Sequence, residues 1–173
     1  DKGPRPALHD PAEWPDHPYV RAIRDCQVYQ KGFAENPGSL QRAIAAYFGL
    51  VTYVDHNVGR LVRALEETGL AETTRVLYSS DHGDNLGTRG LWGKSTMYEE
   101  AAGVPMIVAG PGLPRGQVCR EPISLVDCFP TILKWAGVAP NPADRDLPGL
   151  PLDEVAAQAP QRTVLCEYHA AGA

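Results

Sequence analysis

The most informative segment of the sequence is Arg75-Val76-Leu77-Tyr78-Ser79-Ser80-Asp81-His82-Gly83-Asp84, with Lys94 ten residues after Asp84. Its first half is an apolar run typical of a buried strand, and it ends abruptly in polar residues and glycine. In an α/β protein, the carboxyl end of such a strand faces the crevice where ligands bind. Asp81 and His82 could coordinate a divalent cation, and Lys94 could grip a tetrahedral oxyanion. The alternative is that these residues form no functional site. Asp81 would then cap a helix in a turn after the strand, and Lys94 would face solvent.

Several segments resemble one known family. The segment Ser80-Asp81-His82-Gly83-Asp84 through Gly93-Lys94-Ser95-Thr96 to Glu100 resembles the second metal-binding segment of the sulfatases, in the alkaline phosphatase superfamily. Within that family it is similar to the choline sulfatase, arylsulfatase and phosphonate monoester hydrolase branch. Three later segments are also similar to this family. Gly103–Gly112 resembles its next strand, Ser124–Leu133 its late helix, and Glu167–Gly172 the strand that opens its C-terminal subdomain.

The resemblance implies a metal-dependent sulfuric ester hydrolase that cleaves a sulfate monoester. By this resemblance Asp81 and His82 bind the metal, Lys94 is catalytic and His169 approaches the substrate; a histidine in a frayed terminus is the alternative for His169. The family's nucleophile is a formylglycine made from a cysteine followed, four residues later, by an arginine. Cys128 copies the first positions of that motif, but Ile132 stands in place of the arginine. We therefore read Cys128 as a core residue and expect no nucleophile in this chain.

The N-terminal paired aspartates of the family's metal site are also absent from the sequence. We therefore expect a truncated fragment, the C-terminal part of a longer enzyme, that does not turn over by itself. The resemblance implies a divalent metal, with calcium preferred and manganese as the alternative. Two other functions stay open: hydrolysis of a phosphodiester or phosphonate monoester on the same scaffold, and a non-catalytic binding or degenerate module.

Composition limits the partners. The formal charge of −5 over 173 residues argues against nucleic acid, and no apolar run is long enough for a membrane span. The four cysteines have no CxxC spacing, which favours reduced thiols in a cytoplasmic protein, with the periplasm or secretion as alternatives. A small anionic sulfate or phosphate ester is the expected substrate, and the full-length enzyme could be a homo-oligomer.

Alternating strand and helix patterns predict an α/β fold with a mostly parallel, doubly wound sheet flanked by helices, as in alkaline phosphatase. We expect an irregular proline-rich surface segment over residues 1–38, the α/β domain over 39–162, and the start of a C-terminal subdomain over 163–173. Apolar residues at three- and four-residue steps predict a helix over Ser39–Thr68, with Ser39 as N-cap and Gly69 at its end. Asp55 lies on this apolar stripe, and we expect it to be buried against a neighbouring loop with His56 exposed; a role of both as ligands is the alternative. Other expected elements are a turn or short helix around Thr96–Ala101 and a helix from Ser124 or Asp127 to about Trp135, ended by Gly137. The expected strands are Val76–Ser79, Val104–Val108 and Thr163–Tyr168.

Overall fold

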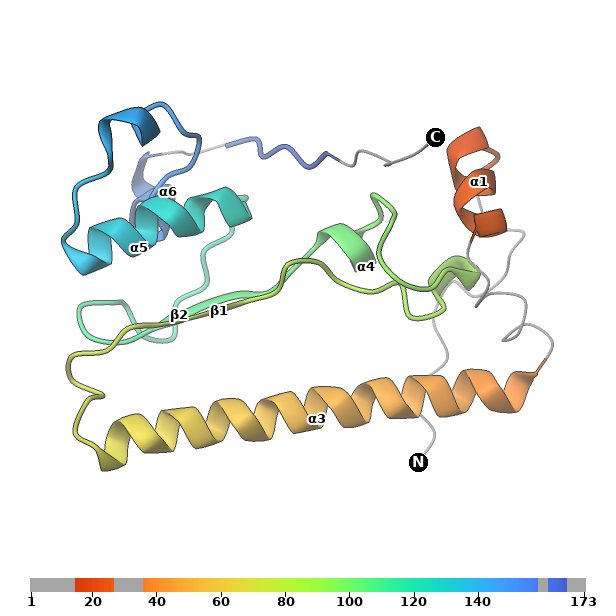
Figure 1. The fold of residues 1–173 in the computed structure, drawn as a ribbon, viewed down its shortest axis with the longest axis horizontal. Coiled ribbons are helices and arrows are strands. Elements are labelled where there is room, and N and C mark those ends of the chain that lie inside the picture. Colours follow the sequence, from red (N-terminus) through yellow and green to blue (C-terminus); the bar gives the residue numbers. More distant parts are fainter. Residues whose placement is uncertain (1–14, 27–35, 159–161, 168–173) are drawn as a thin grey trace. The chain divides into compact units, whose positions relative to one another are not determined.

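The computed structural model describes residues 15–26, 36–158 and 162–167 (Figure 1). The chain divides into two compact units. Of the described residues, the first unit contains 15–26, 36–70 and 79–106, and the second contains 71–78, 107–158 and 162–167.

The first helix, α1 (Pro18–Cys26), lies within the segment expected to be irregular. His17 precedes it, and its Nδ1 accepts a hydrogen bond from the backbone N–H of Tyr19 at 3.2 Å. Pro18 occupies the first helical position, where a missing N–H costs nothing and the fixed φ suits a helix. The prediction of an irregular segment was therefore wrong for these nine residues. The prolines that suggested a loop include one that starts a helix.

Helix α3 (Pro37–Glu67) is the long helix that the apolar periodicity predicted. Its N-cap is Asn36, whose side chain accepts from the backbone N–H of Ser39 at 3.2 Å, so the choice of Ser39 as N-cap was wrong by three residues. Pro37 explains the difference, because proline favours the first position after the cap. The helix ends as predicted: Gly69 has φ +73°, the left-handed conformation that suits glycine beyond a C-cap.

Most of the apolar stripe of α3 is exposed, including Val51 and Leu61, whereas Ile44 is buried. Asp55 is exposed as well, which contradicts the expectation of a buried carboxylate. The periodicity correctly found a helix with one apolar face. It does not guarantee that the described residues cover that face.

Strand β1 (Val76–Ser79) has the predicted bounds and pairs with β2 (Met106–Ala109) in a two-stranded sheet. Ser79, at the end of β1, donates to the carbonyl of Pro105 at 2.9 Å, just before β2 begins. Arg75, just before β1, donates to the carbonyl of Pro111 at 2.9 Å, beyond the end of β2. This pair is therefore antiparallel, an arrangement that large, mostly parallel sheets also accommodate.

Two short helices follow β1 in the first unit: the 3-10 helix η2 (Thr88–Gly90) and α4 (Glu99–Ala102). The second unit contains helix α5 (Cys128–Ala136), preceded by the 3-10 helix η3 (Leu125–Asp127). The 3-10 helix η4 (Pro142–Asp144) and α6 (Leu152–Gln158) come next. Gly137 ends α5 with φ +66°, as predicted. Lys134 joins α5 to α6 through ion pairs with Asp153 at 2.8 Å and Glu154 at 2.6 Å.

Asp127 is the centre of the second unit and is fully buried. One carboxylate oxygen accepts from the backbone N–H of Ser124 at 2.8 Å, and the other from that of Leu150 at 2.9 Å. The guanidinium of Arg162 donates to both oxygens at 2.7 Å. Burial opposes ionisation, but the Arg162 hydrogen bonds and the two backbone N–H groups outweigh it, so the pKa of Asp127 lies below its usual value.

Thr131, one turn further along α5, extends this network. Its hydroxyl donates to the carbonyl of Asp127 at 2.6 Å and accepts from the backbone N–H of Leu152 at 2.9 Å. Nearby, burial raises the pKa of the half-buried Cys128 thiol, and the charge of Asp127 adds to the effect. A partly buried, neutral thiol agrees with the reading of Cys128 as a structural residue.

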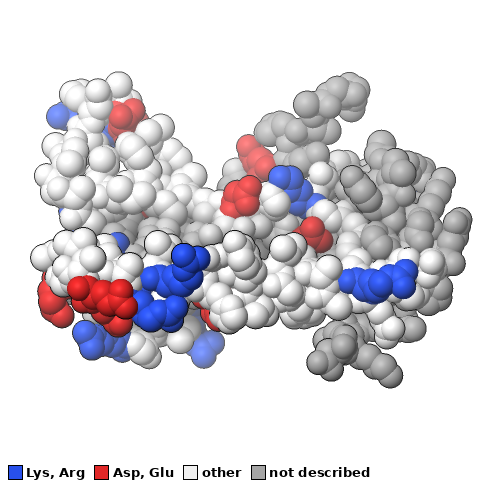
Figure 2. Space-filling model, turned by 60° about the horizontal axis from the view of Figure 1, so that its bottom comes forward, with Lys and Arg blue, Asp and Glu red and all other residues white. Residues whose placement is uncertain are grey.

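No strand forms over residues 162–167, so the prediction of a strand from Thr163 was wrong for its described part; Tyr168 lies outside the described residues. A strand needs a partner, and an apolar β-branched run alone does not supply one. Across the described ranges, no helix combines the length and apolar character that crossing a membrane requires. On the face displayed in Figure 2, charged side chains form small groups of either sign among uncharged residues.

Candidate functional site

The loop that leaves β1 carries the predicted donors. Asp81 and His82 come directly after Ser80, at the carboxyl end of the strand, as the sequence predicted. The loop is held by its own polar groups: Ser80 Oγ donates to the carbonyl of His82 at 2.8 Å, and the His82 N–H donates to Asp81 Oδ1 at 3.0 Å. Asp81 is exposed and His82 is half-buried, so both can reach a ligand.

Lys94 meets these two residues although it lies twelve positions after His82. Its Nζ lies 2.6 Å from His82 Nε2, and Nε2 lies 3.2 Å from Asp81 Oδ2. A carboxylate, an imidazole and an ammonium therefore share one small region of the first unit. This is the set that the sequence analysis selected.

The hydrogen bonds of His82 fix its tautomer. Its Nδ1 lies 2.8 Å from the carbonyl oxygen of Gly83, and a carbonyl can only accept, so Nδ1 carries the hydrogen. In the neutral ring, Nε2 then has a free lone pair, which accepts from the Lys94 ammonium. A backbone carbonyl on one ring nitrogen is also how proteins orient a histidine whose other nitrogen binds a metal.

The charges around Asp81 keep it ionised. Loss of hydration opposes ionisation, but the electrostatic interaction with His82, the N–H groups of Asp81 and His82, and the charge of Lys94 together outweigh it and lower the pKa of Asp81. An ionised carboxylate and an imidazole nitrogen with a lone pair are both common metal ligands. Within the described ranges, no group of three or more His, Cys, Asp and Glu side chains is placed to hold a metal ion.

Lys94 lies in a turn that is closed by hydrogen bonds. Asp84 Oδ1 accepts from the N–H of Leu86 at 2.8 Å and from that of Gly93 at 3.3 Å. Arg89, which has a positive φ of 55°, donates to both carboxylate oxygens of Glu100 at 3.0 and 3.1 Å. Its guanidinium also lies 4.1 Å from the centre of the Tyr98 ring, within cation–π range. These contacts join the turn to α4.

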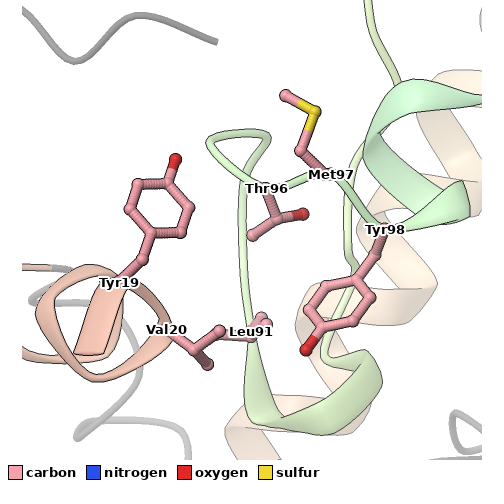
Figure 3. Close-up of a pocket in the computed structure, with 6 residues that line it drawn as sticks. All are labelled: Tyr19, Val20, Leu91, Thr96, Met97 and Tyr98. Carbon is pink, nitrogen blue, oxygen red and sulfur yellow. The ribbon is translucent and has the colours of Figure 1, made fainter. Parts of the chain in front are cut away.

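A small, mainly apolar pocket of about 160 Å³ lies beside the same turn (Figure 3). Tyr19 and Val20 come from α1, and the residues opposite them are Leu91, Thr96, Met97 and Tyr98. The Tyr19 hydroxyl lies 3.2 Å from the carbonyl oxygen of Ser95, the residue after Lys94, and donates a hydrogen bond to it. Helix α1 therefore contacts the turn that presents the lysine.

Gly83 is expected to tolerate no side chain. A Cβ at this position would overlap the carbonyl oxygen of Glu100 and lie 3.4 Å from that of Gly103. Gly83→Ala should therefore force the loop away from α4 and destabilise the protein by about 1–3 kcal/mol, as overpacking does. Urea unfolding of the full-length protein measures the loss.

Gly116→Ala is the control for this substitution. An added Cβ at Gly116 has no atom within 4 Å, so only the strain of its positive φ of 64° should matter, at about 1 kcal/mol. In NMR spectra, Gly83→Ala should also shift the His82 ring resonances, whereas Gly116→Ala should not. Unchanged His82 resonances in Gly83→Ala would show that the loop absorbs the methyl group.

The structure thus brings Asp81, His82 and Lys94 together, whereas His169 lies outside the described residues. The exposed Asp55 and its neighbour His56 lie on α3 and remain without an assigned role. Sequence reasoning did not select two buried polar residues of the Lys94 turn, Asn85 and Thr96. Their hydrogen bonds join positions eight to eleven residues apart in an irregular loop, and no periodic pattern reports such contacts.

Comparison with known proteins gives consistent matches. A sequence model of the sulfatase family matches residues 12–138. The choline-sulfatase of Rhizobium meliloti (strain 1021) is 41% identical over 101 residues, which cover 58% of this chain and 20% of that protein. The phosphonate monoester hydrolase SpPMH from Silicibacter pomeroyi superposes with a TM-score of 0.72 at 30% identity, covering 93% of this chain and 37% of that chain.

A third match is BT4656, solved in complex with its substrate D-glucosamine-2-N,6-O-disulfate. It superposes with a TM-score of 0.59 at 31% identity, covering 81% of this chain and 28% of that chain. The chain thus spans between 20% and 37% of the length of these three relatives. The superposition over nearly the whole chain confirms the predicted α/β fold class.

Proposed function

Because the chain belongs to the sulfatase family, we propose that it supplies one part of the active site of a metal-dependent sulfuric ester hydrolase. The observation that carries the proposal is the meeting of Asp81, His82 and Lys94 in one small region. Two metal-ligand side chains beside an ammonium suit displacement at a tetrahedral anionic centre. A sulfate monoester is the substrate class that the family and these charges favour.

Sulfatases generally use a divalent metal, and the residues present fit part of such a site. Asp81 would hold the ion through its ionised carboxylate. His82 would hold it through the Nε2 lone pair, which remains because Nδ1 donates to Gly83 and which accepts from Lys94 when no ion is bound. Further ligands would come from outside the described residues. When bound, the ion would polarise an ester oxygen and stabilise negative charge. We propose calcium, as the resemblance to the sulfatases implies, with manganese as the alternative that an imidazole ligand favours.

Lys94 would contact the substrate directly in this proposal. Lys94 is exposed, and its ammonium contacts His82 Nε2, so its flexible side chain can carry the charge to a sulfate oxygen. There it would neutralise an equatorial oxygen or the departing alkoxide. The nucleophile would be the family's formylglycine, which would lie outside this chain, because none of the cysteines here has the required arginine four residues later.

One observation favours a second reaction on the same residues. SpPMH, named for phosphonate monoesters, superposes over 93% of the chain. Phosphonate monoesters and phosphodiesters present the same tetrahedral anionic centre to the metal and the lysine. A non-catalytic role has less support. In a site that had lost its activity, nothing would keep a carboxylate, an imidazole and an ammonium within hydrogen-bond distance of one another.

The test is an assay of the full-length protein against a sulfate monoester, a phosphonate monoester and a phosphodiester with the same nitrophenyl leaving group. We expect the sulfate ester to give the highest kcat/KM. Chelation should abolish the activity, and added calcium or manganese should restore it. A higher kcat/KM for the phosphonate or the phosphodiester would show that the protein is a phosphonate monoester hydrolase or phosphodiesterase instead. If none of the three esters is hydrolysed after metal addition, the proposed catalytic function is wrong and a non-catalytic role is the remaining explanation.

A further inference from the structure

Asn85 is the most enclosed polar residue of the turn that carries Lys94. It has no exposed surface, and it lies at the start of the turn, three positions after His82. A buried amide needs hydrogen-bond partners, because an unsatisfied one costs the full loss of its hydration. The hydrogen-bond partners of the Asn85 side chain therefore indicate which parts of the turn it holds together.

Those partners lie on both sides of Lys94. The Asn85 Nδ2 donates to the carbonyl oxygen of Gly93 at 2.6 Å, and the backbone N–H of Asn85 donates to the same oxygen at 2.9 Å. On the other side of the lysine, the Thr96 hydroxyl donates to Asn85 Oδ1 at 3.2 Å. One side chain thus joins the residue before Lys94 to the second residue after it.

The surroundings make this bridge stiff. Thr96 is 7% exposed, and Leu91, within the same turn, is 1% exposed, so water has little access to replace either hydrogen bond. The side chain of Asp84 closes the turn separately, through the N–H groups of Leu86 and Gly93. Lys94 itself is exposed. A flexible side chain therefore projects from a backbone segment that is fixed at both of its ends.

We infer that Asn85 is the positioning residue for Lys94: by holding Gly93 and Thr96 it fixes the backbone from which the ammonium reaches the substrate. The inference rests on the proposed function, because it assigns the lysine a place at the reacting ester. A misplacement of about 1 Å at a catalytic group can lower the rate about 10²-fold, so the geometry of this turn is expected to matter. Asn85 touches neither His82 nor Asp81 in the hydrogen bonds that it makes to Gly93 and Thr96.

The test is a double-mutant cycle in the full-length enzyme, with Asn85→Asp and Lys94→Ala separately and combined. The aspartate keeps an oxygen for Thr96 but turns the donor to Gly93 into an acceptor that repels its carbonyl. We expect Asn85→Asp to lower kcat by about 10- to 100-fold with a smaller change in KM, since the lysine is displaced and not removed. In the Lys94→Ala background, the same change should lower kcat by less than about threefold, because residues that act as a unit are non-additive.

Thr96 provides the conservative control. Thr96→Ser keeps the hydroxyl that donates to Asn85 and should retain kcat, whereas Thr96→Val removes it and should reproduce part of the Asn85→Asp loss. This pair makes the same comparison if Asn85→Asp does not fold. Melting temperatures in both Lys94 backgrounds separate stability from positioning, since a merely structural Asn85 would lower kcat equally in each.

The outcomes distinguish the inference from the function on which it rests. If Lys94→Ala lowers kcat strongly but the Asn85→Asp loss is the same in both backgrounds, Asn85 does not act through Lys94 and the inference is overturned. If Lys94→Ala alone leaves kcat near normal, the proposed role of the lysine fails, and the inference fails with it. A strong loss that disappears in the Lys94→Ala background supports both.

Discussion

Replacement of Asp127 by Ala in the full-length protein is expected to lower the free energy of unfolding by about 3–5 kcal/mol. The carboxylate is fully buried and accepts four hydrogen bonds, from Ser124, Leu150 and both ends of the Arg162 guanidinium. Its removal leaves the mostly buried Arg162 charge without its partner and two backbone N–H groups without acceptors. Chemical unfolding followed by circular dichroism measures the loss.

Asp153→Asn is the matched control in the same unit. Asp153 also pairs with a cation, Lys134, but both side chains are partly exposed and Lys134 keeps Glu154 as a second partner. A loss below about 1 kcal/mol is therefore expected. If Asp127→Ala cost no more than this control, Asp127 would not be the centre of the second unit.

The contribution of Asp127 should also depend on pH in one direction. Its folded-state pKa lies below the unfolded value of about 3.9. Its stabilising effect is then fully present above that unfolded value and is lost as the pH falls through the lower, folded-state pKa. The stability difference between the native protein and Asp127→Asn should therefore be constant near neutral pH and shrink below about pH 4. A difference that grew on acidification would contradict the assignment.

Lys94→Ala is expected to lower kcat/KM of the full-length enzyme by about 10²–10³-fold, or about 3–4 kcal/mol, with the fold intact. The ammonium would be aimed at an oxyanion that develops in the transition state, and a sulfate ester offers more than one oxygen to contact. Stability should hardly change, because Lys94 is exposed and contacts the half-buried His82 through its ammonium. Steady-state kinetics and a melting curve on the same preparation measure both effects.

Two further variants check the assignment of Lys94. Lys94→Arg should restore activity only in part, because a planar guanidinium does not place a point charge at the same depth. Lys134→Ala makes the same chemical change at the lysine of α5 and should leave kcat/KM near normal. Near-normal turnover with early melting in Lys94→Ala would make Lys94 a structural residue, and the oxyanion assignment would be wrong.

Local sequence was sufficient where structure depends on neighbours in the chain. The apolar run before Asp81 gave the bounds of β1, and the three- and four-residue periodicity gave most of α3. Glycines at positions 69 and 137 marked helix ends because only left-handed backbone continues the chain there without strain. The same local reasoning misplaced the N-cap of α3, where Asn36 and Pro37 compete with Ser39 over a range of three residues.

Prediction from local sequence failed where an element needs a partner that is distant in the chain. The run from Thr163 has the composition of a strand but forms none among residues 162–167, and the apolar face of α3 did not bury Asp55. Pairing and burial depend on what the rest of the molecule places opposite a segment, and propensity does not contain that information. The prolines of the N-terminal segment led to the prediction of an irregular chain, but the structure has a helix at Pro18–Cys26. Its cause is local: His17 accepts a hydrogen bond from the first turn, and Pro18 occupies the first helical position.

The sequence by itself determined which residues could form a site: Asp81 and His82 by their place after a strand, and Lys94 by its motif. The three-dimensional structure was needed to show that the Lys94 ammonium lies 2.6 Å from His82 Nε2 and that the Asn85 side chain holds the turn of Lys94. The physical reason is that residue type and spacing specify chemistry, whereas hydrogen bonds between positions eight to twelve residues apart in an irregular loop depend on the complete path of the backbone.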